Sequence, residues 1–184
     1  MSEKKLAIET KPAGAIKTRD LDPKFKYEIS KVPGAENIKL CFQCGTCTAD
    51  CPIARFSDIY RPRKLMRMTQ LGMKDRVLSS EALWLCAACF TCVDHCPQGV
   101  EIASVLRALR NMAVKEGIMP AVFRELTSNI MNTGYAYRIP ELRLKKRVEK
   151  GLPPLPKTNV KDVSKLFDMV AVSKASKREE KGNG

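Results

Sequence analysis

The chain has no long hydrophobic run, and this absence bounds where it works. Its 184 residues contain no uncharged apolar stretch of about 18 residues or more, so the sequence predicts no membrane span. The beginning, MSEKKLAIETKPAGAIK, has lysines but lacks the apolar run of a signal peptide. We therefore expect a cytoplasmic protein. In that reducing compartment, cysteines bind metals more often than they form disulfides.

Sequence motifs of common enzyme classes are missing as well. There is no GxGxxG pattern for a dinucleotide and no GxxxxGK[ST] loop for phosphates. His95 is the only histidine and lies within a cysteine run, so the sequence offers no second histidine for a Ser/His/Asp type of catalytic site. The sequence therefore predicts a chain without a catalytic site of its own.

The net charge of +13 does not follow a nucleic-acid pattern. A nucleic-acid footprint is a basic stripe interleaved with aromatic residues. Only the short run of Arg143, Lys145, Lys146 and Arg147 comes near this pattern. We interpret the charge as solvated helix faces and partner docking, and we expect no nucleic acid.

All eight cysteines fall into two runs with the same spacing, CxxCxxCxxxCP. CFQCGTCTADCP covers residues 41–52, and CAACFTCVDHCP covers residues 86–97. Zinc sites usually take two cysteines from one short knuckle and two from another element. Three thiolates at positions i, i+3 and i+6 instead wrap a loop around a bulkier group. The spacing favours two cubane [4Fe-4S] clusters, with paired zinc sites and disulfides as the alternatives.

In the two-cluster arrangement, each cluster takes three cysteines from one run and the last cysteine of the other run. The first predicted set is Cys41, Cys44, Cys47 and Cys96. The second predicted set is Cys86, Cys89, Cys92 and Cys51. Pro52 and Pro97 then turn the chain away just after each crossing ligand. Because each cluster bridges the two halves of the core, we expect cluster assembly and folding to be one event.

Several residues near the runs invite a functional interpretation. The eight cysteines already supply eight cluster corners, so His95 is at most a tuning residue, acting by charge or hydrogen bonding. Phe42, Trp84 and Phe90 flank the runs, and we expect them to be apolar cover that excludes water from the clusters. Asp50 is expected to be a solvated surface residue.

Periodicity predicts an all-α protein, because alternating strand patterns are scarce. Pro62 suits the start of a helix that ends at Gly72. Ser79 or Ser80 can cap a short helix that leads into Cys86. Two longer helices follow the second run, and they are expected from residue 102 to near residue 117 and from residue 120 to residue 134. The residues of their inward faces are Ile102, Val105, Leu106, Leu109, Met112, Ala113, Phe123, Leu126 and Ile130.

We divide the chain into three parts. Residues 1–37 are predicted to be an N-terminal arm, residues 38–135 an α-helical ferredoxin domain with two [4Fe-4S] clusters, and residues 136–184 a basic C-terminal extension. The extension contains a stiff spacer, GLPPLP, and then a short amphipathic helix from Val160 to Val170. That helix is suited to dock either on a partner or on its own domain.

The residues around the cysteines resemble a known family. CFQCGTCTADCP, RPRKLMRMTQLG and WLCAACFTCVDHCPQGVEI closely resemble the C subunit of heterodisulfide reductase from methanogenic archaea, over about residues 38–117. The iron-sulfur subunits of succinate dehydrogenase, fumarate reductase and anaerobic glycerol-3-phosphate dehydrogenase share the cysteine spacing. The short chain, without a preceding plant-type ferredoxin domain, favours the first family.

This resemblance implies a helical ferredoxin fold of the succinate dehydrogenase and fumarate reductase C-terminal type, with extended arms. It also implies electron transfer within an oxidoreductase complex of methanogenesis. In the family, a flavin-bearing A subunit bifurcates electrons, and a B subunit with CCG-type motifs reduces the coenzyme M–coenzyme B heterodisulfide. This chain has no adjacent cysteine pair, so we do not expect it to bind the disulfide substrate.

The resemblance also implies further partners. A hydrogenase or a formate dehydrogenase feeds the A subunit in soluble complexes, and a cytochrome subunit replaces the A subunit in membrane complexes. We favour the A-type partner here. Two other functions stay open from the sequence: an iron-sulfur subunit of a quinone-linked membrane dehydrogenase, and a redox-silent, metal-stabilised docking module.

Overall fold

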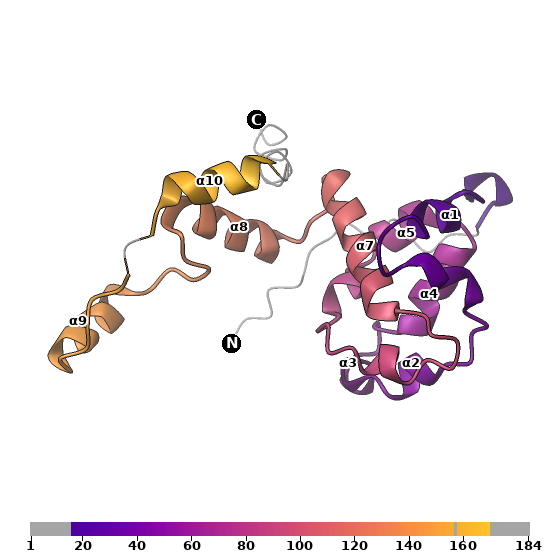
Figure 1. Cartoon of the computed structure of the whole chain (residues 1–184), viewed down its shortest axis with the longest axis horizontal. Coiled ribbons are helices and arrows are strands. Elements are labelled where there is room, and N and C mark those ends of the chain that lie inside the picture. The colour runs from indigo at the N-terminus through magenta and orange to yellow at the C-terminus, as the bar shows by residue number, and fades with distance from the viewer. Residues whose placement is uncertain (1–15, 157, 170–184) are drawn as a thin grey trace. The chain divides into compact units, whose positions relative to one another are not determined.

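The structure is a computed structural model that describes residues 16–156 and 158–169. The described residues form helices and connecting segments without any β-strand (Figure 1), which confirms the all-α prediction for this part of the chain. The chain divides into two compact units, Met1–Ile118 and Met119–Gly184, called unit 1 and unit 2 below. Within the described ranges, no helix has the length and apolar character needed to cross a membrane.

Unit 1 contains both cysteine runs. Its 3₁₀ helices are η1 (Thr18–Asp20), η2 (Glu36–Leu40) and η3 (Glu81–Leu85). Its α-helices are α1 (Phe25–Ile29), α2 (Thr46–Ala49), α3 (Pro52–Phe56), α4 (Pro62–Gln70), α5 (Lys74–Leu78), α6 (Thr91–Asp94) and α7 (Ile102–Lys115). In Figure 1, α2 and α3 lie at one end of unit 1, and α1 and α5 lie at the other. Helix α2, which carries Cys47, contacts α6, which carries Cys92, so the two cysteine-bearing helices lie together.

Helix α7 provides the central apolar face of unit 1. The periodic positions Ile102, Val105, Leu106 and Leu109 are all 2% exposed or less, as the spacing predicted. Helix α7 contacts α1, α5, α6 and η3. Burial of these aliphatic side chains stabilises the fold by about 1.5–3 kcal/mol for each residue. The helix thus ties the second cysteine run to the rest of the core.

Helix α4 begins at Pro62 and is followed by Gly72, as predicted. Gly72 has φ +75°, and a Cβ at this position would collide with the backbone carbonyl of Asp22. The Asp22 amide donates a hydrogen bond to the Gly72 carbonyl at 2.8 Å. Only glycine therefore allows the segment around Asp22 to pack against the end of α4.

Three features of unit 1 differ from the sequence expectation. Residues 81–85 form a 3₁₀ helix, and its N-cap, Ser80, makes no side-chain capping bond. Helix α5 was not predicted, because it spans only five residues and its apolar pair is too short to show a period. Within the predicted arm of residues 1–37, α1 is a core helix whose Phe25 and Ile29 are fully buried.

Unit 2 contains α8 (Ala121–Thr133), α9 (Glu141–Glu149) and α10 (Val160–Met169). Helix α8 follows Pro120 and ends at Gly134, as predicted. Its expected inward positions are only half-buried at Phe123 and Ile130 and exposed at Leu126, because few elements cover this helix. Helix α10 packs along α8, and the two lie side by side in Figure 1. The amphipathic C-terminal helix thus packs on its own chain, within unit 2.

Candidate metal centre

The first cysteine run is shaped by two residues in left-handed backbone conformation. Helix η2 leads into Cys41, and then Gln43 has φ +67° and Gly45 has φ +95°. Gly45 is the N-cap of the one-turn helix α2, which carries Cys47. Because left-handed residues reverse the direction of the chain sharply, the loop curls so that successive cysteines face a common side.

The second run repeats this backbone. Helix η3 leads into Cys86, and Ala88 and Phe90 have φ values of +52° and +63°. Phe90 is the N-cap of α6, which carries Cys92. The two loops therefore have the same geometry forty-five residues apart, with glycine at one left-handed position and phenylalanine at its counterpart.

Cys47 lies within electrostatic reach of the other three thiols of the first predicted set. Burial raises the pKa of Cys47 to about 11, against an opposing hydrogen bond from Thr48. The thiols of Cys41, Cys44 and Cys96 act on Cys47 electrostatically and raise its pKa further. These three neighbours are the other members of the first set, and Cys96 comes from the second run.

The second set converges in the same crosswise manner. Burial raises the pKa of Cys92 to about 12, and the thiols of Cys86, Cys89 and Cys51 raise it further. Cys51 belongs to the first run, so it reaches across to this set. Cys47 also acts on Cys92, which places the two sets next to each other. Thiols crowded in this way stay protonated near neutral pH unless a positively charged group lies among them.

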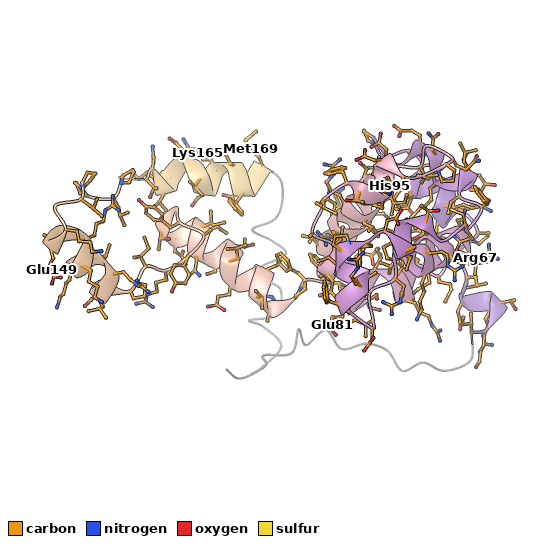
Figure 2. The ribbon with its side chains drawn as sticks, turned by 90° about the horizontal axis from the view of Figure 1, so that it is seen from below. Arg67, Glu81, His95, Glu149, Lys165 and Met169 are labelled. Carbon is orange, nitrogen blue, oxygen red and sulfur yellow. The ribbon has the colours of Figure 1, made fainter. Side chains whose placement is uncertain are left out.

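The two runs also meet outside the cysteines. Helices α2 and α6 contact each other, and the Nδ1 of His95 lies 2.7 Å from a carboxylate oxygen of Asp50. These residues directly precede Cys96 and Cys51, the two cysteines that cross between runs. Both side chains are partly exposed, at 52% and 39%. His95 is labelled in Figure 2. His95 and Asp50 therefore form a link between the runs, which the sequence reasoning missed.

Hydrogen bonds reach several of the sulfurs. Thr46 shares one with Cys44 at 3.5 Å, and Thr91 shares one with Cys89 at the same distance. These bonds lower the pKa of the Cys44 and Cys89 thiols. The second cysteine of each run, which is exposed, is thus hydrogen-bonded to a threonine two positions later in the sequence.

Backbone and amide donors reach three other sulfurs. The amide of Ala88 donates to Cys86 at 3.4 Å, and the amide of Val100 donates to Cys96 at 3.3 Å. The side-chain nitrogen of Gln43 donates to Cys41 at 3.4 Å. Donors of this kind stabilise negative charge on cluster ligands.

Tyr60 is a site residue that the sequence did not reveal. It is 1% exposed, and its side chain is hydrogen-bonded to Cys86. Burial, together with the neighbouring thiols of Cys86, Cys51 and Cys92, raises the pKa of Tyr60 above its usual range. A neutral hydroxyl therefore lies beside the second set. Its position nine residues after Cys51, in a linker, gave no signal of this contact.

Two further residues clamp the loops and were not predicted. Gln70, from the end of α4, donates to the carbonyls of Ile38 and Cys41 at 3.2 and 2.8 Å. Arg110, from α7, donates to the carbonyls of Leu83 and Cys86 at 2.9 and 2.7 Å. The clamped carbonyls occupy equivalent positions in the two halves. Each loop entrance is therefore held by a side chain from a different long helix.

The predicted apolar cover is only partly present. Trp84 is buried at 8% exposure, whereas Phe42 and Phe90 are exposed at 59% and 42%. The expectation was therefore wrong for the two phenylalanines. They lie on the surface of unit 1, and each directly follows a cysteine in the sequence. Their ring faces are available to another protein rather than packed on the core.

The residues present fit two cubane clusters. Each predicted set offers four thiols, the number of iron corners in a cubane. Desolvation and the neighbouring thiols raise the pKa of Cys47 and Cys92, so near neutral pH these two stay protonated unless iron supplies positive charge. Within the described residues, no three His, Cys, Asp or Glu side chains form a group suited to one metal ion. A cubane requires a wider separation of sulfurs than a single ion does.

One comparison with known proteins matches the part of the chain that contains the cysteines, and others match most of its length. Residues 37–100 match the family model of the 4Fe-4S dicluster domain. The chain is 39% identical over 150 residues to the iron-sulfur C subunit of the CoB--CoM heterodisulfide reductase of Methanopyrus kandleri, covering 78% of each chain.

Two other relatives have related names. The chain is 34% identical to the C subunit of the H(2):CoB-CoM heterodisulfide,ferredoxin reductase of Methanothermobacter thermautotrophicus, over 88% of this chain and 86% of the relative. It is 33% identical to the C2 subunit of the H(2)/formate:CoB-CoM heterodisulfide,ferredoxin reductase of Methanococcus maripaludis, over 82% and 86%. The matching dicluster domain and this similarity over most of the chain lead to one conclusion: the protein belongs to the family of iron-sulfur C subunits of heterodisulfide reductases.

Proposed function

We propose that this chain relays electrons through two [4Fe-4S] clusters inside a heterodisulfide reductase complex. Cys41, Cys44, Cys47 and Cys96 would hold one cluster, and Cys86, Cys89, Cys92 and Cys51 would hold the other. The observation that carries this proposal is that the other three thiols of each set, one of them from the other run, act electrostatically on Cys47 in the first set and on Cys92 in the second. We further propose that residues 38–135 form a helical ferredoxin domain of the succinate dehydrogenase and fumarate reductase type.

The clusters, when bound, would supply one-electron transfer. The chain's own residues hold the ligands and control their surroundings. Gln70 and Arg110 fix the two loop entrances through backbone carbonyls. Tyr60 places a neutral donor on Cys86 and closes that side to water, since it is almost fully buried. None of these residues forms a substrate-binding acid–base site, which suits a carrier of electrons.

The route of the electrons follows from the family. We propose that a flavin-bearing A-type subunit donates electrons and that a B-type subunit with CCG motifs accepts them to reduce the coenzyme M–coenzyme B heterodisulfide. The names of the relatives from Methanothermobacter thermautotrophicus and Methanococcus maripaludis both contain hydrogen and ferredoxin, and the second also contains formate. They support a complex that also contains a hydrogenase or a formate dehydrogenase. We further propose that this complex works in the cytoplasm.

Anaerobic affinity purification of the tagged chain from its native source tests this function. We expect about eight irons per chain, an absorbance near 400 nm that dithionite bleaches, and co-recovery of a flavoprotein and a CCG-type chain. A redox-silent chain that carries zinc would overturn the relay. Recovery with membrane cytochromes and quinone would instead assign the chain to a membrane dehydrogenase.

A further inference from the structure

A basic groove runs along α4 on unit 1, beside the first cysteine run. It is a hollow of about 740 Å³. Its basic lining residues are Arg61, Arg63, Lys64, Arg67 and Arg76, and its described lining includes no aspartate or glutamate. A concave surface with charge of one sign attracts groups of the opposite sign and raises their local concentration. The basic groove is therefore suited to an anionic ligand.

Three of these cations are available to another molecule. Arg63, Lys64 and Arg67 are exposed, and their spacing places them along one side of α4. Arg67 is labelled in Figure 2. The ion pairs found among the described residues lie at Arg19, Lys74 and His95, and none involves these three side chains. Like charges held this close repel one another, so an anionic partner would stabilise the surface.

Arg61 has a different role in the groove. Its guanidinium donates to the backbone carbonyls of Ala54 and Tyr60 at 3.1 and 2.9 Å, and also to the carbonyl of Ser57. It therefore fixes the segment between α3 and α4. The groove has a rigid wall on this side and does not need to be built by its ligand.

The groove also contains apolar surface. Leu71 and Ile16 are 41% and 50% exposed, and Met68 is half-buried. Methionine adapts its shape to different apolar partners. A small inorganic anion would use only the cations, whereas a peptide with both carboxylates and apolar side chains would use the whole surface. The lining therefore suits an acidic, amphipathic protein segment.

The position of the groove connects it to the first cysteine set. Gln43 lines the groove and donates to Cys41 at 3.4 Å. Thr48 also lines it, lies between Cys47 and Cys51 in sequence, and accepts a hydrogen bond from the Arg63 amide at 2.9 Å. A protein bound in the groove would therefore lie next to the cluster held by the first set.

The chain's own ends do not supply the missing negative charge. Residues 1–15 contain three lysines and two glutamates, and residues 170–184 contain four basic residues and two glutamates. Both ends have more basic than acidic side chains, so neither complements the exposed cations Arg63, Lys64 and Arg67. We propose that the basic groove docks an acidic, amphipathic segment of a partner subunit of the reductase complex, beside the first cysteine set. This inference rests on the proposed function, because it needs a redox partner to deliver the segment.

The test compares two charge-reversal variants of the full chain, purified anaerobically with its partners. Arg63→Glu/Arg67→Glu reverses two groove cations, and Lys24→Glu/Lys31→Glu makes the same charge change at exposed positions outside the groove. We expect the groove variant to keep its iron content but to recover one partner subunit about tenfold less than the wild-type chain. The control variant should recover all partners, and rising salt should weaken wild-type recovery.

Several results would refute docking in the basic groove and leave the proposed function intact. One is equal partner recovery by the groove variant and the wild-type chain. Another is an equal loss in both variants, since this would show a general charge effect. Release of the partner by nuclease would identify nucleic acid as the occupant, and a dimer converted to monomer with full partner recovery would identify a second copy. A wild-type chain without iron or partners would instead refute the proposed function.

Discussion

The two cysteine runs share one backbone design but are held by different side chains. Equivalent carbonyls at each loop entrance accept hydrogen bonds, from the neutral amide of Gln70 in the first half and from the cationic guanidinium of Arg110 in the second. Tyr60 adds a hydrogen bond to Cys86 in the second half. Repetition of the fold therefore fixes which backbone groups are held, while the charge near each set is free to differ.

This difference has a redox consequence if both sets bind clusters. Positive charge and hydrogen bonds near a ligand favour the reduced, more negative form of a cluster. Arg110 is only part-buried but contacts a carbonyl of the ligand Cys86 itself, whereas the exposed cations near the first set are screened by water. The second set is therefore expected to hold the cluster of higher potential.

The largest effect is expected from breaking the crosswise sharing. Cys51→Ala removes a buried sulfur that links the first run to the second set, whereas Cys44→Ala removes an exposed sulfur within its own run. We expect Cys51→Ala to lose helicity in far-ultraviolet circular dichroism together with both clusters, because assembly and folding are coupled. Cys44→Ala serves as the matched control and should keep more helicity. A Cys51→Ala protein with native helicity and one intact cluster would refute the coupling.

Arg110 and Gln70 allow the difference between the halves to be measured. Arg110→Gln removes a charge and at least one charged hydrogen bond to a backbone carbonyl, a loss of about 1.5–3 kcal/mol. Gln70→Ala removes neutral hydrogen bonds of about 1 kcal/mol each. Urea-induced loss of visible absorbance gives both midpoints.

The same pair of variants tests the redox asymmetry. In a potentiometric titration followed by electron paramagnetic resonance, Arg110→Gln should lower one cluster potential and leave the other nearly unchanged. Gln70→Ala should not lower the same potential. If Arg110→Gln shifted both potentials equally, the charge of Arg110 would not distinguish the two sets.

Substitutions at the left-handed positions of the two loops are expected to change stability less, and in opposite directions. Gly45→Ala is expected to destabilise the protein by about 1–2 kcal/mol, since φ is +95°. An added Cβ would meet only Arg63, with its Cδ at 3.7 Å, so the cost comes from the backbone alone. Ala88→Gly, at φ +52° on an exposed residue, should stabilise by up to about 1 kcal/mol. Urea midpoints that move in the same direction for both variants would contradict this interpretation of the loops.

The pair between Asp50 and His95 should contribute least. Both side chains are partly exposed, and such pairs are worth about 0–1 kcal/mol. Asp50→Asn is therefore expected to lower the urea midpoint only slightly. Because the two residues occupy equivalent positions, the swap Asp50→His/His95→Asp should restore the wild-type midpoint. A loss larger than that of Arg110→Gln would show that the pair orients the crossing cysteines.

The helices with long apolar periods could be predicted from the sequence. Pro62 and Gly72 bound α4, and the spacing from Ile102 onward identified the buried face of α7, because sterics and periodicity act locally. Helix α5 could not be recognised, since five residues contain little more than one turn. Helix α1 lay hidden in a segment rich in charge, and only the fold reveals that Phe25 and Ile29 are buried.

The site divides in the same way. The cysteine spacing predicts both sets, and the assignment stays a prediction that is supported by the electrostatic effect of the neighbouring thiols on Cys47 and Cys92. Tyr60, Gln70 and Arg110 could not be found, because each contacts its loop across at least 24 positions of sequence. Their partners are backbone carbonyls or a sulfur, which impose no pattern on the sequence. The spacing of the cysteines therefore predicts the metal ligands, whereas the residues that surround them are determined by tertiary packing.

The most direct test is the cluster content of the anaerobically purified chain, measured by native mass spectrometry. The wild-type protein should carry two [4Fe-4S] clusters, about eight irons, with all eight cysteines unpaired by disulfides. A Cys51→Ala chain examined in parallel should carry no stable pair of clusters. A wild-type chain that bound two zinc ions, or one that kept a single cluster on one run alone, would contradict the crosswise two-cluster site.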